Sequence, residues 1–201
     1  EPYRTLLGHF RHESGHYFWD RLVAGKPRRL SACRALFGDD RLDYGQALQK
    51  HYDQGAPPNW QNDFVSMYAT THPWEDFAET WAHYLHIVDT LETAGAFGLK
   101  VKPRRARGEL AAEIDFDPYR AKNMEVLIRA WLPIEFATNS MNRSMGQLDL
   151  YPFVLSPKVI EKLAFIHELT HARAATPKPA SAGGQSPRFQ AQSAVSQALP
   201  G

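Results

Sequence analysis

Two histidines four residues apart are the side chains of this chain best suited to metal chemistry. They occur in the run His12-Glu13-Ser14-Gly15-His16, which has the pattern HExxH. Because residues four apart project from one face of a helix, both imidazoles can reach a single ion while Glu13 lies beside them. Neutral imidazole suits Zn²⁺, and a catalytic zinc site needs a third protein ligand and an open position. His12 and His16 are therefore predicted zinc ligands, with Glu13 as the general base that acts on a water molecule.

The third ligand is predicted in the segment that begins at Pro73. Glu75 and Glu79 are four residues apart there, so both carboxylates lie on one face of the expected helix. One of them can bind the metal while the other orients a metal-binding histidine. Tyr68, seven residues before Glu75, carries a phenol that could donate a hydrogen bond to a developing oxyanion. A half-buried tyrosine without a catalytic role is the alternative at this position.

Several other ring side chains lie near these candidates in the sequence. We expect His9, which shares a helix face with both motif histidines, to orient a ligand or to have a structural role. His72 and His83 flank the two glutamates and are fallback ligands. Surface or packing positions are expected for His51 and His86. Trp74 and Trp81 are expected to pack in the core, with a platform for substrate as the alternative.

A second HExxH motif, His167-Glu168-Leu169-Thr170-His171, lies near the other end of the chain. The motif alone does not distinguish the two copies. After His171 the sequence contains no further His, Asp, Glu or Cys that could complete a metal site. We therefore interpret the second copy as a solvated or capping helix end. The alternative is a zinc site completed by an earlier residue or by a partner chain.

The composition is that of an ordinary soluble globular domain. The chain has 201 residues, of which 43% are hydrophobic and 22% charged. Its formal charge of +1 provides no overall field that attracts nucleic acid or an anionic membrane. The single cysteine, Cys33, excludes an internal disulfide and a thiolate zinc ribbon within this stretch. We expect a peptide or protein substrate, no nucleic-acid or membrane partner, and a cytoplasmic location.

Apolar spacing and helix-ending residues predict a mainly α domain over residues 1–174. The expected helices cover about 3–23, 29–37, 42–54, 73–91, 123–145 and 156–173, with a further helical turn or two in 59–68. The first helix is amphipathic, and Pro133 should kink or break the fifth. Residues 95–108 contain glycines and a basic run, which indicates an exposed loop or a subsite for acidic ligands. Residues 175–201, rich in Ala, Ser, Pro, Gln and Gly, indicate a disordered tail.

Several segments resemble the bacterial putative zinc-binding metallopeptidase family. The main ones are LLGHFRHESGHYFWDRL at 6–22, which holds the first HExxH motif, and HPWEDFAETWAHYLH at 72–86, which holds both glutamates. Later segments, NRSMG at 142–146 and YPFVL at 151–155, fit the same family. The resemblance covers most of residues 1–174, and it implies a zincin-like metallopeptidase domain that hydrolyses peptide bonds with one zinc ion.

The segment 72–86 is also similar to the ligand helix of the lethal-factor type of gluzincin, in which an ExxxE pair binds zinc through its first glutamate. This resemblance implies Glu75 as a zinc ligand, Glu79 as the orienting carboxylate and Tyr68 as the oxyanion donor. Zincins usually carry a sheet before the HExxH helix, and only eleven residues precede His12. The chain is therefore expected to hold the helical part of an N-terminally truncated domain. The alternative is a non-catalytic module in which zinc joins two helices and the surface binds a partner protein.

Overall fold

The computed structural model describes residues 5–104 and 110–172, and most of these residues lie in helices. The α-helices are α1 (Leu6–Leu22), α2 (Pro27–Phe37), α3 (Tyr44–Gln54), α4 (Pro73–Ala96), α5 (Met124–Ser144) and α6 (Pro157–His171). The short elements are the 3₁₀ turns η1 (Trp60–Asn62), η2 (Tyr68–Thr70) and η3 (Pro118–Arg120) and an antiparallel pair of strands, β1 (Lys100–Val101) and β2 (Ala112–Glu113). The prediction of a mainly α fold is confirmed.

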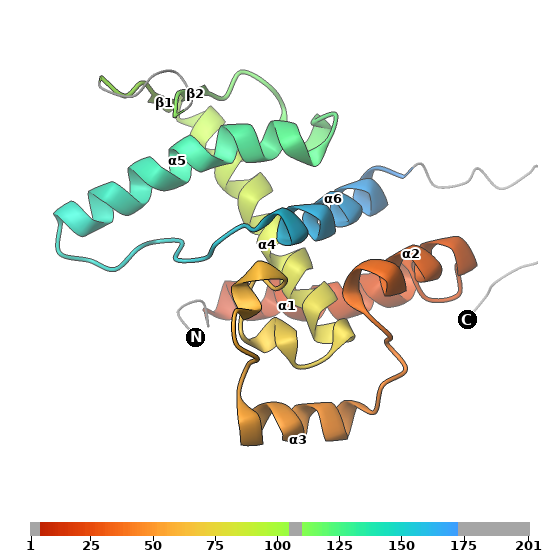
Figure 1. The fold of residues 1–201 in the computed structure, drawn as a ribbon. Coiled ribbons are helices and arrows are strands. Elements are labelled where there is room, and N and C mark those ends of the chain that lie inside the picture. Colours follow the sequence, from red (N-terminus) through yellow and green to blue (C-terminus); the bar gives the residue numbers. More distant parts are fainter. Residues whose placement is uncertain (1–4, 105–109, 173–201) are drawn as a thin grey trace, which may run out of the picture.

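Helix α4 is the central element, and α1, α2, α5 and α6 pack around it (Figure 1). Its apolar residues form much of the core, and Phe77, Ile87 and Leu91 are completely buried. The helix continues to Ala96, five residues past the end expected from the sequence. Because Ala94 is also buried, packing supports this additional turn.

The first turn of α4 is fixed by local signals in the sequence. His72 is the N-cap, and its Nδ1 accepts a hydrogen bond of 3.1 Å from the Trp74 backbone N–H. Pro73 occupies the first turn, where a missing N–H costs nothing. Glu75 and Asp76 follow at the positive end of the helix dipole, which favours carboxylates. This turn therefore has a defined position and direction.

Helix α1 crosses α4 at Gly15, where the two backbones approach closely. A Cβ atom at Gly15 would lie 2.9 Å from the Ala78 Cα and 3.1 Å from the Trp81 Cβ. The buried face of α1 consists of Gly8, His12 and Gly15. The large apolar residues of α1 that stay exposed are Leu6, Leu7, Phe10, Tyr17 and Phe18, of which Phe18 also stacks on Trp81 of α4 with 4.9 Å between the ring centroids. The prediction of an ordinary amphipathic helix is therefore wrong for α1, because small residues make this contact.

We predict that Gly15→Ala destabilises the chain by about 1–3 kcal/mol, because the added methyl group meets the backbone of α4. This loss opposes a gain of about 1 kcal/mol from the higher helix propensity of alanine. Gly45→Ala on α3 is the matched control, because the nearest atom to its added Cβ would be the Asp43 Oδ1, at an ordinary contact distance of 3.4 Å. Urea unfolding of both variants measures the difference. Equal stability of the two variants would contradict the close crossing.

Three further expectations from the sequence concern Pro133, residues 59–68 and the two segments with biased composition. Helix α5 is continuous through Pro133, which is buried, so packing maintains the helix across the missing hydrogen bond. The helical turn or two expected in 59–68 is present as η1 and the start of η2, both of the 3₁₀ type. The expected tail at 175–201 and part of the basic loop, 105–109, lie outside the described residues. No helix in the described part has the length and apolar character needed to cross a membrane.

Candidate metal centre

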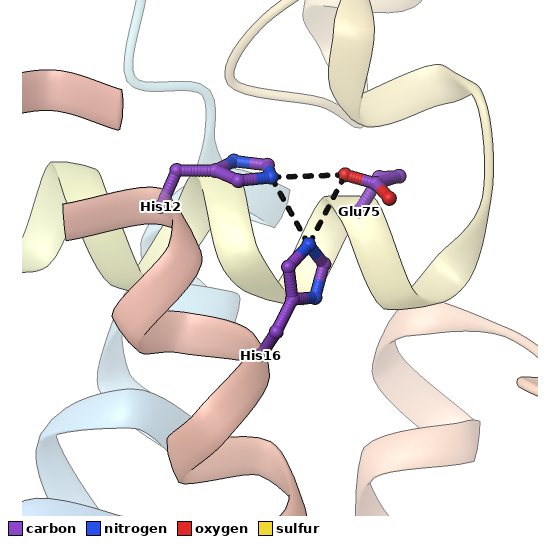
Figure 2. A group of neighbouring side chains, drawn as sticks. All are labelled: His12, His16 and Glu75. Atoms are coloured by element: carbon purple, nitrogen blue, oxygen red, sulfur yellow. Dashed lines mark hydrogen bonds and ion pairs between the residues drawn. The ribbon is translucent and has the colours of Figure 1, made fainter. Parts of the chain in front are cut away.

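Three potential metal ligands from two helices converge at one point. Figure 2 shows His12 and His16 of α1 directed towards Glu75 of α4. The Nε2 atoms of the two histidines are 3.1 Å apart. The Oε2 atom of Glu75 lies 3.0 Å from the His12 Nε2 and 3.5 Å from the His16 Nε2. Bonds of about 2.0–2.1 Å in a tetrahedron place ligand atoms about 3.3–3.4 Å apart, so these three atoms already have the spacing of a zinc site.

The chemistry of this trio also fits a divalent cation. Glu75 is only 2% exposed, and its buried Oε2 atom lies against the imidazoles of His12 and His16 without a well-aligned hydrogen bond. A buried carboxylate oxygen in this condition is costly, and a cation would satisfy it. Two imidazoles and one glutamate form a ligand set found in catalytic zinc sites. Among the residues described, no second group of His, Cys, Asp or Glu side chains offers a comparable set of ligand atoms.

The charges of the trio favour an ionised carboxylate and a protonated imidazole when metal is absent. Burial alone would raise the pKa of Glu75, but the interactions of its carboxylate with His12 and His16 outweigh it and hold the pKa well below its usual range. Burial lowers the pKa of His12, but Glu75 and Glu79 outweigh this effect and raise it to about 9. The site therefore holds a proton that a metal ion would displace on binding.

Glu79 orients His12 from the side opposite the trio. Its Oε1 atom accepts a hydrogen bond of 2.7 Å from the His12 Nδ1, and its Oε2 atom accepts one of 2.6 Å from the Ser66 hydroxyl. A proton fixed on Nδ1 leaves the Nε2 lone pair of His12 available to a metal. Glu79 is thus placed where the family resemblance implied. Ser66 was not anticipated, because no spacing pattern connects it to Glu79.

His16 is oriented by ring packing instead of by a carboxylate. Its ring lies 3.8 Å from the ring of Trp74, with 36° between the planes. Its Nδ1 atom is buried and has no hydrogen-bond partner. Trp74 was expected in a packing position, and the structure places it, half-buried, directly against a candidate ligand. The prediction that Trp81 packs in the core is confirmed by its burial.

Two further candidates, Tyr68 and Glu13, lie close to the ligands in different ways. The Tyr68 ring is half-buried, with its centroid 5.9 Å from that of His12. Burial, and then the charge of Glu75, raises the pKa of Tyr68, so its phenol keeps the proton. Glu13 follows His12 on α1, and its exposed side chain lies 3.7 Å from the His9 Nε2. His9 therefore pairs with Glu13 rather than with a metal-binding histidine.

Tyr44, the first residue of α3, is a contact of the trio that sequence reasoning missed. Its hydroxyl donates a hydrogen bond of 2.9 Å to the Oε1 atom of Glu75. The two residues are 31 positions apart and lie on different helices. No motif or helical spacing connects them, so only the folded arrangement could reveal this contact.

The fallback ligands His72 and His83 do not join the trio. The Nε2 atom of His72 donates to the Leu42 carbonyl at 3.1 Å, while its Nδ1 caps α4. His83 is buried with its Nδ1 atom 2.7 Å from the Tyr151 hydroxyl, and burial lowers its pKa to about 4. His86 is also buried and accepts a hydrogen bond from Arg11. The roles of these histidines in the structure are capping and packing.

The second HExxH motif uses its histidines to bind backbone carbonyls. The His167 Nε2 donates to the Ala121 carbonyl at 3.1 Å, and the His171 Nε2 donates to the Tyr119 carbonyl at 2.9 Å. Both bonds connect α6 to the segment just before α5. The expectation of a solvated helix end is wrong for His167, which is only 3% exposed. This motif is therefore a structural contact in the described part of the chain.

Comparison with known proteins identifies the family. A sequence profile described as "Putative zinc-binding metallo-peptidase" matches residues 1–169. The chain belongs to this family. A zinc-binding family agrees with the cluster of His12, His16 and Glu75, which could hold a metal ion. No solved structure matches the chain.

Three mycobacterial proteins are similar to this chain. Uncharacterized proteins of Mycobacterium bovis and of two strains of Mycobacterium tuberculosis are each 49% identical to this chain over 180 residues. The match covers 90% of this chain and 50% of each relative. The chain therefore spans about half the length of the curated relatives it matches.

Proposed function

We propose that this chain forms the zinc-binding catalytic part of a peptidase that hydrolyses peptide bonds. The observation that carries the proposal is the convergence of His12, His16 and Glu75, whose ligand atoms lie 3.0–3.5 Å apart. Membership of the metallo-peptidase family supports the same reaction class. One set of three ligands is suited to one zinc ion. When bound, zinc would supply Lewis-acid polarisation and lower the pKa of water to about 7.

Glu13 is the proposed general base. It is adjacent to a ligand, and its side chain is 55% exposed, so water and a peptide can reach the carboxylate. Glu13 would accept a proton from the attacking water and later deliver it to the leaving amine.

Tyr68 is the proposed oxyanion donor. Its phenol stays protonated because burial and the nearby carboxylate of Glu75 oppose ionisation. A hydrogen bond from this phenol would stabilise negative charge that develops on the scissile carbonyl oxygen. Glu79 would keep the His12 ring in the orientation that binding requires, through the bond of 2.7 Å to its Nδ1.

Hydrolysis of an unfolded protein tests this function. Casein offers many accessible peptide bonds, and we expect the zinc-loaded chain to cleave it. Cleavage should stop with a chelator and return when zinc is added. Zinc-dependent stabilisation without any cleavage would contradict the proposal and would favour the alternative module, in which metal only joins α1 to α4.

A further inference from the structure

The two oxygen atoms of Glu75 have different environments. Oε2 faces the two histidines without a well-aligned hydrogen bond, whereas Oε1 accepts the bond of 2.9 Å from the Tyr44 hydroxyl. A carboxylate can bind a metal through one oxygen or through both. We propose that Tyr44 is a positioning residue that holds Oε1 away from the metal, so that Glu75 binds through Oε2 alone. This inference rests on the proposed function, because it takes Glu75 to be a zinc ligand.

A tyrosine hydroxyl is chemically suited to this role. The terminal torsion of a glutamate side chain has a broad energy minimum, so the carboxylate can rotate unless a partner holds one oxygen. The phenol of Tyr44 donates one hydrogen bond and carries no charge. A lysine or arginine at the same place would also hold Oε1, but its positive charge would repel a bound cation.

The position of Tyr44 depends on the same turn that carries Glu75. His72, the N-cap of α4, donates from its Nε2 to the carbonyl of Leu42, two residues before Tyr44. The Tyr44 ring also packs edge-on at 5.5 Å from the ring of His72 and 6.2 Å from that of Trp74. Both partners of the hydrogen bond are therefore fixed to the first turn of α4.

Tyr44 has little part in the hydrophobic core, so its hydroxyl can be removed without a large packing change. Helix α3 contains no buried residue, and Figure 1 shows it apart from the other helices, joined to them by extended segments. Tyr44 itself is 38% exposed. Its bond to Glu75 is thus one of few contacts that connect this helix to the rest of the domain.

Tyr44→Phe tests the inference, with Tyr52→Phe as the matched control. Tyr52 lies on the same helix and is 70% exposed. Zinc affinity is measured by competition with a chromophoric chelator. We expect Tyr44→Phe to weaken zinc binding by roughly 10–100-fold, the usual cost of losing a partner that orients a ligand. Tyr52→Phe should bind zinc as the wild type does.

Cobalt provides a readout that a purely structural role would not change. The visible absorption of bound Co²⁺ loses intensity as its coordination number rises. We expect this loss in Tyr44→Phe, because Glu75 can then bind with both oxygens. Wild-type zinc affinity together with a wild-type cobalt spectrum in Tyr44→Phe would overturn the inference. If Tyr44→Phe has no effect but Glu75→Gln weakens zinc binding, only the inference about Tyr44 fails and the proposed function stands. A wild-type chain that binds no zinc would overturn both the inference and the proposed function.

Discussion

Glu13→Gln retains bound zinc and loses roughly 10²–10⁴-fold in the rate of peptide hydrolysis, the usual contribution of general acid and base groups. Glutamine has nearly the same shape as glutamate, but its amide does not take up the proton of the attacking water. Glu13 is not among the three converging ligands, so zinc content should remain that of the wild type. The rate and the zinc content are measured on the same preparation.

Glu168→Gln is the matched control for this substitution. Glu168 holds the corresponding position in the second HExxH motif and is exposed on α6. Its flanking histidines bind the carbonyls of Ala121 and Tyr119, so we expect full activity. Retained activity in Glu13→Gln would contradict the assignment of the general base. Loss of activity in Glu168→Gln would show that the second motif is required.

Lys162→Met has the largest expected effect on stability, a loss of about 3–5 kcal/mol. The Lys162 ammonium donates to the Asp76 Oδ2 at 2.6 Å and to the Asp63 carbonyl at 2.6 Å. Lys162 and Asp76 have exposed side-chain fractions of only 3% and 0%. Burial raises the pKa of Asp76, and Lys162 offsets part of this effect. Without Lys162, the carboxylate remains buried with no counter-charge.

The free energy of unfolding in urea measures this loss. Lys158→Met is the control, because Lys158 lies on the same helix in an exposed pair with Glu161 and should change stability by less than about 1 kcal/mol. Adding Asp76→Leu to Lys162→Met should recover part of the loss, since no charge then remains buried. A loss below about 1 kcal/mol in Lys162→Met would contradict the importance of this ion pair.

The Lys162 pair also affects the metal site through its position. Asp76 directly follows Glu75, so the pair joins the first turn of α4 to α6. Helix α1 supplies the two histidines, and α4 supplies the carboxylate. The candidate ligand Glu75 therefore lies in a turn that a buried ion pair joins to α6.

Local sequence signals were sufficient for most of the helices and for bringing two histidines to one helix face, whereas the choice of Glu75 over Glu79 came from the family resemblance. The spacing of His12 and His16 placed both rings on one face of a helix, and the Pro73 signal correctly started the helix that carries Glu75. Both inferences depend on residues within one turn of each other, where backbone geometry alone decides which side chains are neighbours.

Contacts between distant segments could not be predicted in this way. Tyr44 and Ser66 reach Glu75 and Glu79 across 31 and 13 positions, with no periodic pattern to indicate either contact. The packing of α1 was also not predicted, because Gly15 allows α1 to approach α4 closely and the spacing of apolar residues does not indicate this contact. Tertiary contact, rather than local propensity, determines these features.

The position of zinc in crystals of the zinc-loaded chain is the most direct test of this account. X-ray diffraction recorded on both sides of the zinc absorption edge locates the metal without reference to any assumed ligand. We predict one anomalous peak about 2.0–2.2 Å from the Nε2 atoms of His12 and His16 and the Oε2 atom of Glu75. A peak beside His167 and His171, or no peak at the three proposed ligands, would contradict the account.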